Sequence, residues 1–197
     1  KGFTKVFTPH SYYIESEDIY FDNNSEIKEI KSEKSTLITD KDKNEIILQN
    51  FNYETKFNVF KSIGSIKIKD KLNNTYEFSQ IYIDAKKKEI LGTDAKAFMN
   101  HQSFKINEEN KPRIFSNTLT SDRNRSSFKK SVFTLCDYRE NDKCPPWTIQ
   151  ASEMLHDNKK KTIFYDNAIV KVYNIPVFYL PKLSHPDPSV ERRSGFL

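Results

Sequence analysis

Ser79-Gln-Ile-Tyr-Ile-Asp84-Ala-Lys-Lys-Lys-Glu-Ile90-Leu-Gly-Thr-Asp94-Ala95 is the stretch that decides the fold, because it occurs twice. It aligns without a gap with Ser152-Glu-Met-Leu-His-Asp157-Asn-Lys-Lys-Lys-Thr-Ile163-Phe-Tyr-Asp-Asn167-Ala168. In each copy a β-favouring run ends at an Asp, a Lys-rich stretch follows, and a second β-favouring run opens on Ile. Asp and Asn begin turns by accepting hydrogen bonds from the nearby backbone. Each copy therefore predicts a strand, a turn and a strand.

Two further stretches follow the same plan. Asp40-Lys-Asp-Lys-Asn-Glu45-Ile46-Ile-Leu-Gln-Asn50 is a third copy, and Glu17-Asp-Ile-Tyr-Phe-Asp22-Asn-Asn-Ser-Glu26-Ile27 is a weaker fourth copy with a turn one residue shorter. One such unit cannot bury its apolar face, whereas several stacked units form a continuous core. The repeats therefore predict an all-β protein whose antiparallel strands stack as a solenoid-like array or a jelly roll.

The same pattern of β-favouring runs and polar turns predicts the other elements of the chain. Strands are expected at 46–53, 65–68, 75–84, 88–91, 95–99, 148–156, 162–165 and 168–173. Turns are expected at 70–74 and 122–125, and the best helix candidate is 25–35. Four prolines between residues 176 and 188 predict an edge strand or an extended linker, because proline lacks the backbone N–H. We place a boundary within 181–188.

The composition supports the β assignment. The 197 residues include 19 Ile, 15 Phe and 10 Tyr but only 10 Leu and 5 Ala. Branched and aromatic residues favour strands, whereas Ala and Leu favour helices. Only four glycines occur, which excludes glycine-rich phosphate-binding loops. No apolar run approaches the roughly 20 residues of a membrane-spanning helix.

Charge and motifs argue against catalysis and against nucleic acid. Lys and Arg number 32 against 27 Asp and Glu, a net charge of +5, but the basic residues are scattered among acids and Asn. No RNA-binding aromatic motif or zinc finger occurs, so no nucleic-acid partner is expected. The four histidines fall in no metal-ligand spacing, and no nucleophile motif is present. We expect no enzyme, no catalytic residue, no metal and no cofactor.

Two Lys runs occupy the same turn in the two best repeats, Lys86-Lys-Lys88 and Lys159-Lys-Lys161. They form either a basic edge for anionic head groups or solvated turns that discourage edge-to-edge aggregation. The second interpretation is the one we favour from the sequence.

The two cysteines, Cys136 and Cys144, lack the spacing and the additional Cys or His of a zinc site. A disulfide is the better interpretation. It joins these two residues, or joins one of them to a part of the protein outside these 197 residues. Either arrangement requires an oxidising compartment.

The C-terminal third carries a set of specific motifs. They are Cys144-Pro-Pro-Trp147-Thr-Ile-Gln-Ala151, Pro176-Val-Phe-Tyr179-Leu-Pro181, Ser184-His185-Pro186-Asp187-Pro188 and Arg192-Arg193-Ser194-Gly195-Phe196. This region resembles the LptD family of outer-membrane LPS-assembly proteins, also called OstA or Imp, and most closely its alphaproteobacterial members. The upstream repeats resemble the OstA-like periplasmic domain that this family shares with the soluble bridge protein LptA.

The resemblance implies a twisted β jelly roll of stacked antiparallel strands on the periplasmic side of the outer membrane. Residues 1–181 would form the OstA-like domain, and residues 182–197 a linker and the start of an outer-membrane β-barrel, so that the chain is a fragment. The domain would receive lipopolysaccharide from an LptA-like bridge protein, shelter its acyl chains, and pass it to the barrel, which works with the lipoprotein LptE. Family members form disulfides between domain and barrel, for which Cys136 and Cys144 are the candidates here. The alternative is a docking module that joins partners by strand addition.

A groove for acyl chains needs apolar side chains from many strands, because acyl chains make no hydrogen bonds. Strand alternation predicts which side chains point inward and are candidates to bind lipid. These are Phe51, Tyr53, Ile66, Ile68, Phe78, Ile81, Ile83, Ile90, Phe98, Ile149, Met154 and Ile163. The alternative for each of them is that it fills a closed core. Lys and Arg at the mouth of a groove could meet lipid phosphates.

Overall fold

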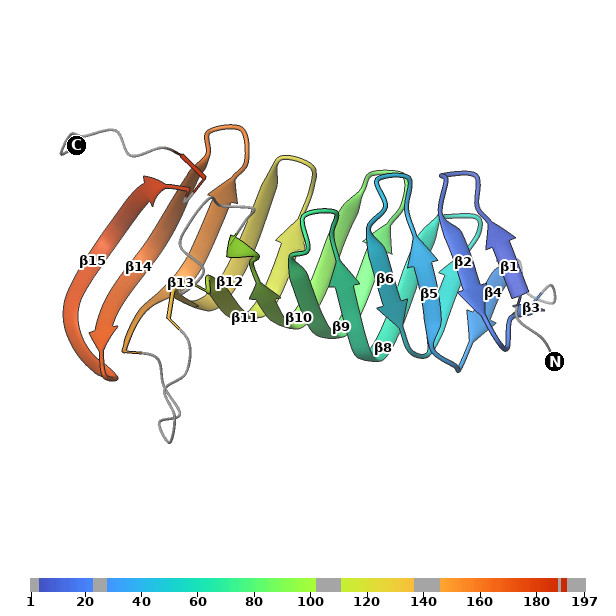
Figure 1. Cartoon of the computed structure of the whole chain (residues 1–197), viewed down its shortest axis with the longest axis horizontal. Coiled ribbons are helices and arrows are strands. Elements are labelled where there is room, and N and C mark those ends of the chain that lie inside the picture. Colours follow the sequence, from blue (N-terminus) through green and yellow to red (C-terminus); the bar gives the residue numbers. More distant parts are fainter. Residues whose placement is uncertain (1–3, 23–27, 102–110, 137–145, 188, 191–197) are drawn as a thin grey trace.

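The computed structural model describes residues 4–22, 28–101, 111–136, 146–187 and 189–190. Figure 1 shows the strands following one another along the long axis of the molecule, with β1 near one end and β15 near the other. The strands are β1 (Thr4–Phe7), β2 (Tyr13–Ser16), β3 (Tyr20–Asp22), β4 (Glu29–Ser32), β5 (Thr36–Thr39), β6 (Glu45–Leu48), β7 (Phe51–Glu54), β8 (Val59–Lys69), β9 (Thr75–Asp84), β10 (Glu89–Phe98), β11 (Arg113–Ser121), β12 (Arg125–Thr134), β13 (Trp147–Asp157), β14 (Thr162–Val172) and β15 (Ile175–Pro186).

Within the described residues all fifteen strands belong to one antiparallel sheet. From β8 onward each strand pairs with the next strand of the chain, so the sheet grows by consecutive hairpins. At the N-terminal end the path is β1-β2-β5-β6-β8, and the branch β3-β4-β7 joins the sheet through β8. The prediction of an all-β, jelly-roll-like protein of stacked antiparallel strands is confirmed.

The in–out alternation breaks once in every strand from β9 to β14. In β14, Ile163 and Tyr165 are buried, Asp166 and Asn167 both face outward, and Ala168 is buried again. Two consecutive outward side chains bend a strand, and its apolar face then continues on the inside of the bend. The outward pairs are Ser79 and Gln80, Thr93 and Asp94, Asn117 and Thr118, Lys129 and Lys130, Ser152 and Glu153, and Asp166 and Asn167.

These outward pairs form one continuous line across the sheet, which we call the corner row. The strand register joins Gln80 to Thr93, Thr93 to Thr118, Thr118 to Lys129, Lys129 to Glu153, and Glu153 to Asp166. In alternate strands the corner includes a residue with left-handed backbone: φ is 51° at Asp94, 49° at Lys130 and 52° at Asn167. The sheet folds along the corner row, so the two halves of each strand face each other across an apolar interior.

Three sequence predictions need correction or extension. The helix candidate at 25–35 is wrong, because Glu29–Ser32 forms β4 with alternating burial, while residues 25–27 lie outside the described residues. The strands β11 and β12 were not anticipated, although the turn between them was. The repeat copy at 40–50 does form strand, turn and strand. However, Glu45 pairs with Lys69, which places its turn at the opposite end of the strands from the turn after Asp84.

The Pro-rich tail forms the last strand of the sheet. β15 pairs only with β14 among the described strands, as the prolines predicted for an edge, and it ends at Pro186, inside the range 181–188 in which a boundary is expected. Its apolar side chains are largely exposed, with Ile175, Phe178 and Tyr179 each 60% exposed or more. Among the residues that the structure describes, we find no helix with the length and apolar character that a membrane crossing requires.

Candidate functional site: an apolar groove between the halves of the sheet

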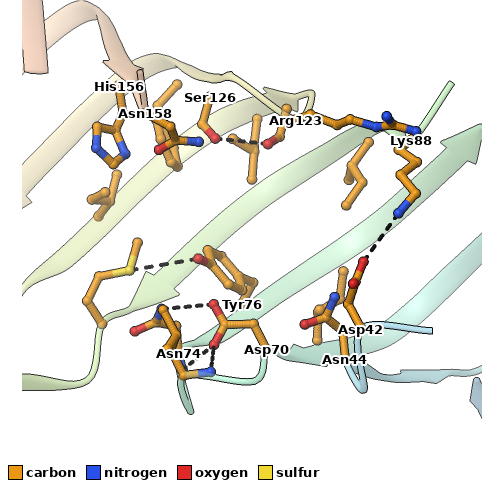
Figure 2. A pocket seen from close by; sticks show the side chains of 18 of the residues that line it. Asp42, Asn44, Asp70, Asn74, Tyr76, Lys88, Arg123, Ser126, His156 and Asn158 are labelled. Atoms are coloured by element: carbon orange, nitrogen blue, oxygen red, sulfur yellow. Dashed lines mark hydrogen bonds and ion pairs between the residues drawn. The ribbon is translucent and has the colours of Figure 1, made fainter. Parts of the chain in front are cut away.

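A cavity of about 770 Å³ lies between the two halves of the folded sheet. Figure 2 shows that its labelled polar side chains lie along two opposite edges, with apolar side chains between them. The apolar residues that line it come from nearly every strand between β6 and β14: Ile46, Ile68, Phe78, Ile83, Ile90, Ile114, Leu119, Phe128, Phe133, Met154 and Ile163. The interior is therefore a long apolar groove with a polar mouth.

One edge of the mouth, which we call the first rim, is built by the turns 40–44 and 70–74. Oδ1 of Asp40 accepts hydrogen bonds from the N–H groups of Asp42 and Asn44, both at 2.9 Å, and Nδ2 of Asn44 donates to Oδ2 of Asp40 at 2.8 Å. Asp70 and Asn74 repeat this arrangement with the same distances in their own turn. The aspartates of these two turns thus serve to shape the backbone.

The opposite edge, the second rim, is built by the turns after Asp84, Asp122 and Asp157. Hydrogen bonds from the N–H groups of Asn124, at 2.6 Å, and Arg125, at 2.9 Å, lower the pKa of the Asp122 carboxyl. Asp157 makes the equivalent bonds to the N–H groups of the lysines that follow it, and these lower its pKa. These turns place three cations on the groove: Lys88, Arg123 and Lys161.

One ion pair crosses the mouth from rim to rim. Nζ of Lys88, in the second rim, lies 3.2 Å from Oδ2 of Asp42, in the first rim, although the residues are 46 positions apart in sequence. The hydrogen bond and charge of Lys88 lower the pKa of the Asp42 carboxyl. Because both side chains are partly exposed, the pair is sensitive to salt.

Aromatic side chains occupy the interior beyond the N-terminal end of the groove. Tyr12, which lines the groove, packs against Phe60 with ring centroids 5.2 Å apart, and Phe60 stacks on Tyr53 at 4.3 Å. Phe60 also stacks on Phe51 at 6.2 Å. Burial and the nearby Asp40 and Asp42 carboxylates raise the pKa of Tyr12 to about 12. Phe51, Tyr53 and Phe60 are no more than 2% exposed and do not line the groove, so its lining stops at Tyr12.

At the C-terminal end the groove is lined by residues that follow β15. Asp187, which is buried, accepts hydrogen bonds from Nε2 of His156 and from the N–H of Ser189, the latter at 2.7 Å. Burial alone would raise the pKa of Asp187, but these hydrogen bonds outweigh it and the pKa is lowered. The N–H of Asp187 donates to the carbonyl of Lys161 at 2.8 Å, which ties this end to the second rim.

Most of the predicted inward residues lie on the inside of the sheet. The six that line the groove are Ile68, Phe78, Ile83, Ile90, Met154 and Ile163. Phe51, Tyr53, Ile66 and Ile81 are buried in the core without lining the groove, and Ile149 is half-buried against the core. Contact of the twelve residues with lipid stays a prediction.

Phe98 is the exception, since it does not point inward. Its strand carries Thr93 and Asp94 in the corner row, so the alternation shifts by one residue and Ala95 and Ala97 point inward instead. Phe98 packs edge-on against Phe115, which pairs with the exposed Lys96, and the ring centroids are 6.2 Å apart. The prediction for Phe98 was wrong because, after the outward pair, it is the alanines at 95 and 97 that point inward.

Several groove residues were missed by the sequence reasoning. Ile114, Leu119, Phe128 and Phe133 belong to β11 and β12, whose many Ser, Thr, Asn and Lys residues hide the apolar alternation. Counting alternation separately on each side of the outward pairs would have found them. No pattern in the sequence identifies the rim residues, because the turns of the first and second rims come to lie on either side of the groove only when the sheet folds.

The cysteine prediction falls partly outside the described residues. Cys136 is half-buried just after β12, where its N–H donates to Oγ1 of Thr134 at 3.1 Å, whereas Cys144 is outside that part of the chain. The disulfide therefore stays a prediction. The described residues contain no group of three or more His, Cys, Asp or Glu side chains that could hold a metal ion.

Comparison with known proteins gives a partial match. No protein-family model matches the chain. Over 69 residues the chain is 36% identical to the LPS-assembly protein LptD of Yersinia pestis bv. Antiqua (strain Antiqua) and to that of Yersinia pseudotuberculosis serotype I (strain IP32953). The matched stretch is 35% of this chain and only 8% of either relative, so the chain spans a small part of the length of the curated relatives it matches. Over about a third of its length, the chain is similar to LptD.

Proposed function

We propose that this chain is the periplasmic domain of an LptD-like protein at the outer membrane, and that its groove shelters the acyl chains of lipopolysaccharide before they pass to a barrel. The observation that carries the proposal is the apolar groove, which runs along the folded sheet and is lined by strands from β6 to β14. The similarity to LptD over 69 residues supports it independently of the geometry. Catalysis has no part in this function.

The energetics of the groove suit an acyl chain. Each buried methylene group contributes roughly 0.8 kcal/mol, so a twelve-carbon chain that left water completely would contribute roughly 10 kcal/mol before the cost of ordering it. The volume of about 770 Å³ lies within the ordinary range for small-ligand pockets. Aliphatic, phenyl and thioether side chains make up much of its lining, and they offer such a chain no competing hydrogen bonds.

In this proposal the described sheet is the OstA-like domain, and the residues after it lead into a barrel that works with LptE. Oxidation of Cys136 and Cys144, with each other or with the barrel, belongs to the same proposal, since a periplasmic location permits disulfides.

Photocrosslinking to lipopolysaccharide tests the lipid site. A photoreactive amino acid in place of Ile90, which lines the groove, is compared with the same amino acid in place of its neighbour Leu91, which is 46% exposed on the outer face. We expect a lipid adduct from residue 90 and little from residue 91. Equal adducts from both positions, or none from residue 90 in a folded variant, would contradict a lipid-binding groove.

A second candidate function is docking by strand addition. Among the described strands the free edges are β1 and the three-residue β3 at the N-terminal end of the sheet and β15 at the other end. β1 pairs with β2 and with no other described strand, and it contains no proline. β15, at the other edge, contains Pro176, Pro181 and Pro186, which have no N–H to donate to an added strand. An LptA-like bridge protein would therefore add its strand beside β1.

Proline substitutions in β1 separate docking from lipid binding. Consecutive residues of a strand direct their N–H groups to opposite sides, so Lys5→Pro or Val6→Pro removes the donor on the free side. We expect one of these variants to lose binding to an LptA-like partner while it keeps lipid binding. If both variants bind the partner like the unmodified chain, docking at β1 is wrong.

A further inference from the structure

The second rim presents one cation to the groove from each of three consecutive hairpins. Lys88 follows β9, Arg123 follows β11 and Lys161 follows β13, and all three line the groove. The other lysines of these turns, such as Lys86 and Lys159, are exposed and do not line it. The sequence therefore directs one cation per hairpin to the mouth of the groove, and the other cations of these turns do not line it.

The direction of these side chains follows from the shape of the turns. Asp84 and Asp157 each accept two N–H hydrogen bonds from the residues that follow, which fixes the backbone of the turn. The last lysine of each turn then has left-handed backbone, with φ of 60° at Lys88 and 49° at Lys161. The equivalent placement of these two lysines is thus a repeated structural feature of the hairpins.

The charges on the second rim are only partly neutralised. Lys88 pairs with Asp42, but neither Arg123 nor Lys161 forms an ion pair with any described residue. Two aspartates of the first rim, Asp40 and Asp70, hold their own turns through hydrogen bonds. Among the described residues, no anion therefore pairs with these two cations at the edge of the apolar groove.

We infer that the second rim is a phosphate-binding rim, at which Arg123 and Lys161 bind phosphate groups on the head of an amphiphile whose chains lie in the groove. This inference rests on the proposed lipid site and names the chemistry of the ligand's head. Successive hairpins are two strands apart, roughly 10 Å, so a head group with two phosphates spans two of these cations. Arg123 can hold one phosphate through two hydrogen bonds and Lys161 attracts another as a point charge.

The test compares two double variants that remove the same charge. Arg123→Gln with Lys161→Gln removes the two unpaired cations of the rim, and Lys86→Gln with Lys159→Gln removes two exposed cations from the flanking turns. The probes are diphosphorylated lipid A and the same lipid after chemical removal of its phosphates. We expect the rim variant to bind the phosphorylated lipid about tenfold more weakly than the control variant does, with a shallower salt dependence. Binding of the phosphate-free lipid stays equal in both.

Three results would overturn the inference. The rim variant could bind the phosphorylated lipid as tightly as the control, or it could lose both lipids equally while its circular dichroism shows an intact fold. Inorganic phosphate could also bind the rim as tightly as the lipid does, which would make the site one for free anions. In the first and third of these cases lipid still binds, so the proposed function stands. Failure of the unmodified chain to bind either lipid would overturn the proposed function as well.

Discussion

Phe78 packs directly onto the Cα atom of Gly92 in the neighbouring strand. A methyl group on residue 92 would lie 2.3 Å from Cδ1 of the Phe78 ring, well inside van der Waals contact. Gly92 has an ordinary strand backbone, so the requirement for glycine here is one of space alone. The Phe78 ring, which lines the groove, can therefore occupy this position only because residue 92 has no side chain.

Gly92→Ala is expected to lower the free energy of unfolding by about 1–3 kcal/mol, because the buried Phe78 ring must move. Urea denaturation followed by circular dichroism measures the loss. Combining Gly92→Ala with Phe78→Leu should recover part of it, since the smaller side chain leaves room for the methyl group. An unchanged midpoint for Gly92→Ala alone would show that the ring adapts without cost.

A corner residue should be sensitive to β-branching. Lys130 has φ of 49°, a conformation that costs a branched side chain about 1–2 kcal/mol. We expect Lys130→Val to destabilise the protein by about that amount and Lys130→Gly to be neutral or stabilising. Lys129→Val is the matched control, because Lys129 is equally exposed in the same corner but has no left-handed backbone. Equal effects of the two valines would remove the argument for strain at the corner.

Neutralising Asp42, the acid of the ion pair that crosses the mouth of the groove, should increase the affinity of the protein for a phosphorylated lipid. Asp42→Asn releases Lys88, which then adds a third unpaired cation to the second rim. We expect two- to fivefold tighter binding of lipid A, roughly 0.4–1 kcal/mol, and little change in stability because the pair is exposed. Titration of fluorescent lipid at low salt measures the change. Asp42→Asn combined with Lys88→Gln should return the affinity to its starting value, and weaker binding by Asp42→Asn alone would contradict the prediction.

The Asp187 carboxylate should make stability depend on acid pH. Its pKa in the folded protein is lowered from 3.8, so its contribution is present above that value and is lost as the pH falls through the lowered folded pKa. Asp187→Asn should therefore be less stable than the unmodified protein at pH 7, and the difference should shrink below about pH 4. Denaturant unfolding of both proteins at pH 7, 5 and 3 gives the difference directly. A difference that is constant with pH would mean that the charge of Asp187 contributes nothing.

The hairpins around Asp84 and Asp157 could be predicted because each turn depends on an Asp that accepts hydrogen bonds from residues two and three positions later. Such local interactions leave a direct pattern in the sequence. The sequence also contains the pairs of adjacent polar residues that form the corner row, such as Asp166 and Asn167. Only the strand register shows that these pairs align and that the alternation shifts after each of them. Phe98, which follows such a pair, was therefore placed on the wrong face.

The sequence predicts that an apolar groove exists, but it does not predict which residues form its rims. Its rims are formed by residues as distant in sequence as Asp42 and Lys88, and their meeting depends on the sheet folding along the corner row. The strands β11 and β12 escaped notice because a strand with one solvated face tolerates Ser, Thr and Lys at half its positions. Edge strands, in contrast, are signalled by proline, as β15 shows.

The corner row gives the groove an additive length. Each hairpin from β9 to β14 carries its own turn, corner and inward side chains, and its strands pair only with the strands beside them. Gain or loss of one hairpin by duplication or deletion would change the groove by roughly 10 Å and leave the remaining hairpins in register. Homologous proteins that bind longer or shorter ligands could therefore arise through a change in the number of hairpins, while the width and lining of the groove stay the same.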